Sequence, residues 1–80
     1  MRGGLKVLSG KEVVDILASF GFVSIGGSKH LKVRRMTPGG DETLIIPNHD
    51  PVAKGTLRAI LSQASRYVPQ SELRPHFYNE

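Results

Sequence analysis

Two stretches of the chain carry apolar residues at the three- and four-residue spacing of a helix with one buried side. The first runs from about Gly10 to Phe20, and Ser9-Gly10-Lys11-Glu12 at its start has the pattern of a capping box. Gly21 follows as a residue suited to left-handed backbone geometry, which predicts the helix end. The second runs from Lys54 to about Ser65. The predicted apolar stripes are Val13, Val14, Ile16, Leu17 and Phe20 in the first, and Leu57, Ile60, Leu61 and Ala64 in the second.

Between the helices, the pattern changes to short segments rich in β-branched residues, which favours strands. The predicted strands are Phe22–Ile25, His30–Arg34 and Thr43–Ile46, the last ended by Pro47. The connections at Gly26-Gly27-Ser28 and at 37–41 are short enough for hairpins, so the three strands should form an antiparallel meander.

The middle strand alternates polar and apolar residues without exception. A period of two places Leu31 and Val33 on the core face. The same period places His30, Lys32 and Arg34 together on the opposite face.

The predicted order is α-β-β-β-α, an α+β fold with two helices packed on one face of a three-stranded antiparallel sheet. The other sheet face is then free. Eighty residues fit one small domain, residues 1–80, with a core of about residues 9–66. For the extension at residues 67–80, the pattern predicts only a short turn at Ser71–Arg74 that Pro75 stops, and leaves open whether this segment packs or frays.

Composition removes several classes of function. The chain has no cysteine, which excludes disulfides and thiolate zinc sites. It contains no apolar run of about 20 residues, so we expect no membrane segment and a soluble, cytoplasmic protein. The glycine pairs lack nucleotide-binding spacing and the histidines lack metal-binding spacing, so neither a cofactor nor a metal site is predicted.

Positive charge is concentrated in two segments, and the formal net charge is +4. One segment holds Lys29, Lys32, Arg34 and Arg35 without an acid, and the other holds Lys54, Arg58 and Arg66 without an acid. Such local positive fields attract polyanions, although a merely solvated basic surface is the simpler alternative.

His30 is the residue that suggests chemistry. It follows the glycine turn, amid Lys29, Lys32 and Arg34, and neighbouring cations favour an uncharged imidazole that can accept a proton. The same cations can hold a phosphate beside the ring. This combination suits metal-free RNA cleavage, in which a base takes the 2′-hydroxyl proton and the oxygen attacks phosphorus. The alternative is an ordinary surface histidine on a strand, with no catalytic role.

Other candidate chemistry is weaker. His49 lies between Asn48 and Asp50 in a loop framed by Pro47 and Pro51, and the pattern leaves open whether it is functional or structural. Ser28 lies two residues from His30, where side-chain alternation makes direct activation awkward.

Two groups of residues resemble one family, the HicA-type mRNA interferase toxins of bacterial toxin–antitoxin pairs. Gly21-Phe22 and Gly27-Ser28-Lys29-His30 are similar to the family's glycine–serine–any–histidine signature. Pro47-Asn48-His49 and the segment from Lys54 to Ala64 resemble its proline–histidine loop and closing helix. The resemblance covers about residues 11–64, in the family's order and at compatible spacing.

The resemblance implies a double-stranded-RNA-binding-like fold and a toxin that cleaves mRNA and arrests translation and growth. It implies that His30 is the catalytic histidine and that Gly27 and Ser28 shape the turn before it. The implied partner is a HicB-type antitoxin, with mRNA as the substrate and no cofactor. We expect Lys29, Lys32, Arg34, Ser28, Lys54 and Arg58 to bind the RNA.

The chain also departs from the family. Many members carry a second histidine where this chain has Lys29, so Lys29, Lys32 or water remains open as the acid. Two alternatives to a nuclease stay open as well: a non-catalytic RNA-binding module of the same fold, and a protein-interaction module whose basic face docks an acidic partner.

Overall fold

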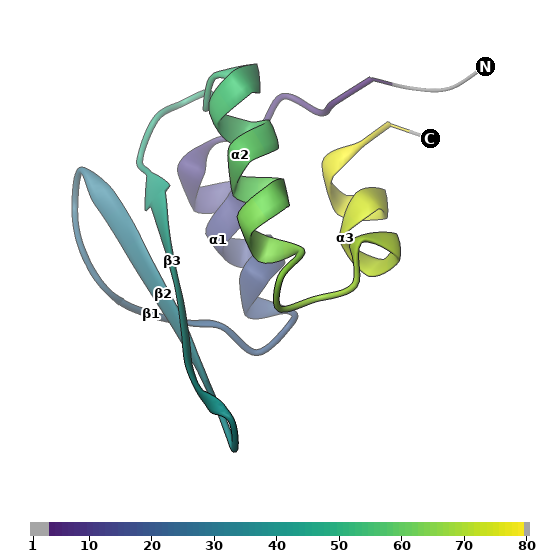
Figure 1. Cartoon of the computed structure of the whole chain (residues 1–80). Coiled ribbons are helices and arrows are strands. Elements are labelled where there is room, and N and C mark those ends of the chain that lie inside the picture. The colour runs from purple at the N-terminus through teal and green to yellow at the C-terminus, as the bar shows by residue number, and fades with distance from the viewer. Residues whose placement is uncertain (1–3, 80) are drawn as a thin grey trace.

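The computed structural model describes residues 4–79, so the predicted domain limits at Met1 and Glu80 lie outside the described residues. The elements are α1 (Gly10–Ala18), β1 (Val23–Gly26), β2 (His30–Thr37), β3 (Gly40–Pro47), α2 (Lys54–Ala64) and α3 (Gln70–Phe77). Through α2 the order is α-β-β-β-α, which confirms the predicted α+β fold, and α3 is added after it (Figure 1).

The capping residues predicted for α1 are present at both of its ends. The Ser9 hydroxyl accepts a hydrogen bond from the Glu12 amide, and the Glu12 carboxylate accepts one from the Ser9 amide. At the other end, Gly21 has a φ of 96°, and the amides of Gly21 and Phe22 donate to the carbonyls of Ala18 and Leu17. These two hydrogen bonds form a Schellman motif, which turns the chain directly into β1.

The sheet is an antiparallel meander in the order β1-β2-β3. β2 pairs with β3 along its whole length, from His30 opposite Pro47 to Thr37 opposite Gly40. β1 is shorter, and its register with β2 shifts between Ser24 and Gly26. The meander was predicted, but β2 and β3 are longer than expected because a two-residue turn at Pro38 and Gly39 lets pairing continue to Gly40.

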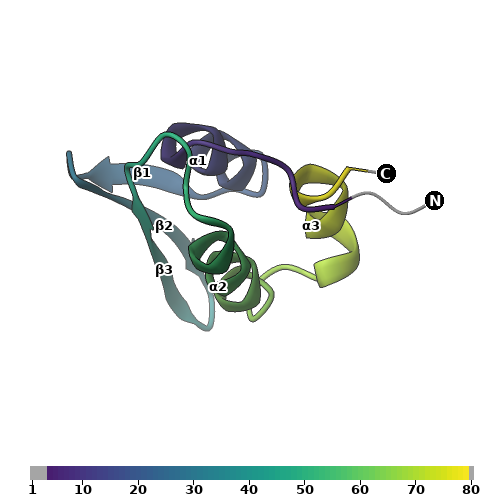
Figure 2. The ribbon, with the colours of Figure 1, turned by 90° about the horizontal axis from the view of Figure 1, so that it is seen from above.

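The molecule has three layers (Figures 1 and 2): the sheet, the pair α1 and α2 against one face of it, and α3 on the far side of that pair. Val33, Leu44 and Ile46 face the helices and are buried. The predicted helix stripes meet them, with these side chains all in the core cluster or packed against it: Val13, Val14, Ile16, Leu17, Phe20, Leu57, Ile60, Leu61 and Ala64. No helix of residues 4–79 covers the other face of the sheet, and we call it the outer face.

The prediction that Pro75 stops a short turn is wrong, because α3 continues through Pro75 to Phe77. Proline inside a helix lacks one amide donor and costs about 3 kcal/mol. Burial offsets this cost, since Leu73 and Phe77 are fully enclosed in the core. His76 adds an edge-on contact with the Phe20 ring at 5.4 Å.

The N-terminal segment pairs with the end of α3. Leu5 forms an antiparallel bridge with Tyr78, the Lys6 amide donates to the Phe77 carbonyl, and the Asn79 amide donates to the Gly4 carbonyl. Leu5 and Leu8 are also buried in the core. Segments from both ends of the chain therefore form one unit behind the two main helices.

Arg35 joins the sheet to the segments that follow α1 and α2. Its side chain faces the helices and contacts Glu42 at 2.7 Å. Its other nitrogens donate to the Phe20 carbonyl at 3.0 Å and the Tyr67 carbonyl at 2.8 Å. These carbonyls lie just beyond the C-terminal ends of α1 and α2, where helix dipoles favour a cation. The guanidinium also covers the Phe22 ring, 4.9 Å from its centre.

Candidate functional site

His30 is the first residue of β2, and it is exposed. The alternation predicted from the sequence is present: Leu31 and Val33 lie toward the core, and Lys32 and Arg34 are exposed with His30. Successive side chains on one face of a strand are about 7 Å apart, so the imidazole, the ammonium and the guanidinium form a row along β2. An exposed imidazole in such a row can approach a polymeric anion.

The turn before His30 is shaped by Gly27. This residue has a φ of 103°, which other residues adopt only with strain. A Cβ at Gly27 would also overlap the carbonyl oxygen of His30. Glycine is therefore required here twice, once by backbone conformation and once by the close approach of the His30 backbone.

Asn48 holds the same turn from the other side. Its side-chain amide donates to the Ser28 carbonyl at 2.7 Å, and its backbone amide donates to the Lys29 carbonyl at 2.9 Å. Gly10 lies close against Pro47 and Asn48, and its amide donates to the His49 carbonyl at 2.8 Å. The loop after β3 thus connects the turn at Ser28 to the start of α1, which positions the His30 backbone.

The sequence analysis singled out His49 from this loop and did not assign a role to Asn48. In the structure, His49 is exposed and its carbonyl oxygen is what contacts α1. The Asp50–Pro51 peptide that follows is cis. A role for Asn48 could have been predicted from its position, because it directly follows Pro47, the residue that pairs with His30.

The predicted RNA-binding residues separate into two groups. Lys32 and Arg34 lie on the outer face, while Ser28 and Lys29 lie in the turn before His30, and all four are exposed. Lys54 and Arg58 are exposed on α2, which packs against the opposite face of the sheet (Figure 2). Only the first group is joined to His30 by the strand and turn that carry it.

Acidic residues are sparse along the row on β2. Lys32 lies opposite Ile45 and Arg34 lies opposite Thr43, so neither cation faces a carboxylate directly across the strands. Arg34 has a long ion pair with Asp41 at 4.0 Å, and both side chains are about half exposed. Within residues 4–79, neither Lys29 nor Lys32 has a carboxylate within ion-pair distance. The row can therefore offer its positive charge to a phosphate.

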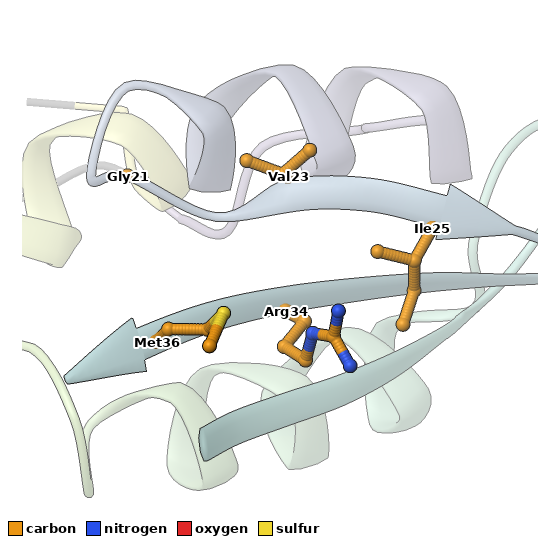
Figure 3. Close-up of a pocket in the computed structure, with 5 residues that line it drawn as sticks. All are labelled: Gly21, Val23, Ile25, Arg34 and Met36. Atoms are coloured by element: carbon orange, nitrogen blue, oxygen red, sulfur yellow. The ribbon is translucent and has the colours of Figure 1, made fainter. Parts of the chain in front are cut away.

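The outer face also carries apolar side chains that the sequence analysis did not single out. Val23, Met36, Ile25 and Ile45 are exposed, the first two by 64% and 73%. A shallow groove of about 320 Å³ lies between β1 and β2, lined by Gly21, Val23, Ile25, Arg34 and Met36 (Figure 3). The alternation of side chains along the strands could have indicated these positions. Met36 lies on the same side of β2 as His30, and the consecutive residues Leu44, Ile45 and Ile46 cannot all face the core.

The described residues offer neither a metal cluster nor a membrane-spanning helix. Nowhere in residues 4–79 do three histidine or acidic side chains gather as they would around a metal ion. Over the same residues, none of the helices has the length and apolar character needed to cross a membrane.

The structure is thus an α+β domain whose open sheet face presents one histidine within a row of cations. Residues 10–65 match the model of a protein family described as the HicA toxin of bacterial toxin–antitoxin. This match spans more than half of the chain, and the chain belongs to the HicA toxin family. Neither the search of curated proteins nor the search of solved structures gives a match.

Family membership assigns the coarse role. The protein is a toxin of the toxin–antitoxin type, and such a toxin has an antitoxin as its partner. The family is known for ribonuclease activity in general. The match ends at residue 65, so α3 lies outside it, as do the residues that precede Gly10.

Proposed function

We propose that this protein is a metal-independent endoribonuclease that cleaves mRNA in the cytoplasm, with His30 as the general acid/base. The observation that carries the proposal is the exposed imidazole of His30 at the head of the row formed with Lys32 and Arg34. The family's ribonuclease activity supports the same assignment.

The chemistry follows from what each group can do. The neutral imidazole of His30 takes the proton of a ribose 2′-hydroxyl, and the 2′-oxygen forms a bond to the adjacent phosphorus. The bond from phosphorus to the 5′-oxygen breaks, and that oxygen leaves with a proton from Lys29, Lys32 or water. The products are a 2′,3′-cyclic phosphate end and a free 5′-hydroxyl end. Lys32, the nearer cation of the row, stabilises the charge that accumulates on the phosphoryl oxygens. Arg34 holds the RNA further along the strand.

The remaining predicted contacts fit a strand of RNA that crosses the outer face. Ser28 and Lys29 in the turn would meet the backbone next to the cut, and Gly27 would keep the turn in shape. Lys54 and Arg58 on α2 would form a second contact, on the other side of the sheet from the row. This separation predicts a smaller effect on cleavage from Arg58 than from Arg34.

The first test is cleavage of a single-stranded RNA with EDTA present by the protein and by His30→Ala. We expect the variant to keep its fold and RNA affinity and to lose about 10²- to 10⁴-fold in cleavage rate, the usual contribution of a positioned proton-transfer group. His49→Ala is measured beside it, because His49 is exposed in the loop that follows the residue paired with His30, and the comparison decides whether the second histidine takes part in cleavage. Undiminished cleavage by His30→Ala would remove this residue from the mechanism.

The cellular counterpart is induced expression. We propose that the wild type arrests growth, that His30→Ala does not, and that a HicB-type antitoxin relieves the arrest by binding the toxin. The toxin role of the family supports this expectation. Growth arrest that persists without His30 would point to sequestration of RNA rather than cleavage.

The alternative is a non-catalytic RNA-binding module of the same fold. The exposed cations and apolar side chains of the outer face favour RNA binding on their own account. In that case RNA is retained with a steep dependence on salt and no cut products form.

A further inference from the structure

We propose that the groove between β1 and β2 binds one unpaired base of the RNA substrate, at a position beside the cut rather than at it. This proposal rests on the proposed ribonuclease function, and it adds a site that selects which RNA is cut. The groove is lined by Val23, Ile25, Arg34 and Met36, with Gly21 at its edge.

The groove lies further along the strand that begins with His30. Arg34 lines it and is four residues from His30 on the same strand, which corresponds to about 13 Å along β2. Lys32 lies between the two, on the same face. A strand of RNA whose scissile phosphate is at His30 and whose next phosphates follow Lys32 and Arg34 therefore brings a neighbouring base to the groove.

The side chains that line the groove suit a nucleobase. Figure 3 shows Arg34 from β2 between Met36 of the same strand and Ile25 of β1, so a planar guanidinium lies among apolar side chains. Unpaired bases in protein–RNA complexes stack on such guanidinium planes and on apolar side chains. Within residues 4–79, a 4.0 Å ion pair with Asp41 is the only contact that holds the Arg34 guanidinium, which can therefore turn toward a base.

The size and charge of the groove favour a base over a protein partner. At about 320 Å³ the groove is at the small end of ligand pockets, which suits one planar group. The exposed apolar side chains are interleaved with cations, as a binder of phosphates and bases requires.

Ile25 and Ile45 provide a matched pair of variants. They are exposed by 40% and 46%, and both lie on the outer face, but only Ile25 lines the groove. Ile25→Thr makes the groove polar while keeping a β-branched residue in the strand, and Ile45→Thr makes the same change outside it. Met36→Gln gives a second groove variant at a side chain that is 73% exposed and so contributes little to folding.

The experiment uses a set of RNA oligonucleotides with one cleavage site, in each of which one nucleotide near the cut lacks its base. The phosphates are unchanged, so the set separates base contacts from charge. Binding is measured with His30→Ala, and KM and kcat with the active protein. We expect one abasic position to weaken binding and raise KM by about 5- to 150-fold, the range of a single stacked base. This penalty should be the same at two salt concentrations.

In Ile25→Thr and Met36→Gln, the ratio of the dissociation constants for abasic and intact RNA should fall toward one. In Ile45→Thr, this ratio should stay as large as in the unchanged groove. The proposal is overturned if no position shows a penalty, or if Ile25→Thr keeps the penalty in full. The groove would then be a candidate site for a protein partner rather than for a base. Binding by His30→Ala distinguishes this failure from failure of the proposed nuclease, because a base penalty in binding survives even where the wild type cuts nothing.

Discussion

Arg34 and Arg35 are adjacent on β2, yet their guanidinium groups have opposite surroundings. Arg35 lies against the helices, bonded to Glu42 and to the carbonyls of Phe20 and Tyr67. Arg34 lies on the outer face with one long contact to Asp41. One arginine has its donors occupied within the fold, and the other has donors to offer. Strand parity alone separates a structural arginine from one that is free to bind a ligand.

The same contrast extends to the two faces of the sheet. The face toward the helices is closed by apolar side chains, and among residues 4–79 no polar or charged residue is buried. The outer face mixes cations, a histidine and exposed apolar side chains. Residues toward the helices should therefore govern the free energy of unfolding, and outer residues should govern binding and cleavage.

The largest expected effect is on the helix side. Phe77→Ala should lower the free energy of unfolding by about 3–5 kcal/mol, because the ring is fully buried between α3 and the core. Met36→Ala, on the outer face, should change it by less than about 0.5 kcal/mol. Urea unfolding followed by circular dichroism measures both. Equal effects would mean that α3 is not part of the stabilising core.

The arginine pair gives the next test. Arg35→Ala should cost about 2–3 kcal/mol of stability, since it leaves the half-buried Glu42 and two carbonyls without their donor. Arg34→Ala should leave the unfolding free energy nearly unchanged and weaken RNA binding instead. RNA affinity measured at several salt concentrations should have a shallower slope for Arg34→Ala. Similar stability losses in the two variants would contradict the structural role of Arg35 and the binding role of Arg34 that strand alternation assigns.

Gly26 and Gly27 test how the outer-face site is held. Both have positive φ, at 137° and 103°, but only at Gly27 would a Cβ overlap the His30 backbone. Gly26→Ala should cost about 1 kcal/mol from backbone strain, and Gly27→Ala about 1–2 kcal/mol more. Cleavage should fall mainly in Gly27→Ala. If both variants cleave equally, the turn does not position His30.

The smallest expected effect is at Asn48. Asn48→Ala removes one hydrogen bond to the Ser28 carbonyl and should cost about 1 kcal/mol or less. We expect a loss of several-fold in cleavage, because the turn before His30 then lacks its side-chain support. Gln63→Ala, at an exposed position on α2, is the control for a lost amide side chain. A stability change without a change in cleavage would make the bond purely structural.

Most of the fold could be predicted from the sequence, because its local signals agree with one another. The capping box at Ser9 and the glycine at position 21 mark α1 within two residues at either end. The helix α3 could not be predicted, because most of its residues are polar and Pro75 opposes a helix locally. Its stability depends on Leu73 and Phe77 entering a core assembled from distant segments, which no local pattern contains.

The candidate site was predictable as far as one strand extends. Alternation placed His30, Lys32 and Arg34 on one face, and it separates Arg35 from the basic run. Contacts between segments were not predictable in this way. The bonds from Asn48 to the turn at Ser28 and the groove formed across β1 and β2 depend on strand register, which includes a shift at Ser24.

The bridge between Leu5 and Tyr78 has a practical consequence. The segments that hold Gly4 and Asn79 are hydrogen-bonded to each other. They lie beside α3, on the side away from the sheet (Figure 2). A fluorescent reporter, an affinity tag or a surface tether that is joined to this side of the molecule therefore projects away from the sheet. The open sheet face then stays accessible to a macromolecule as large as a messenger RNA, even when the toxin is immobilised.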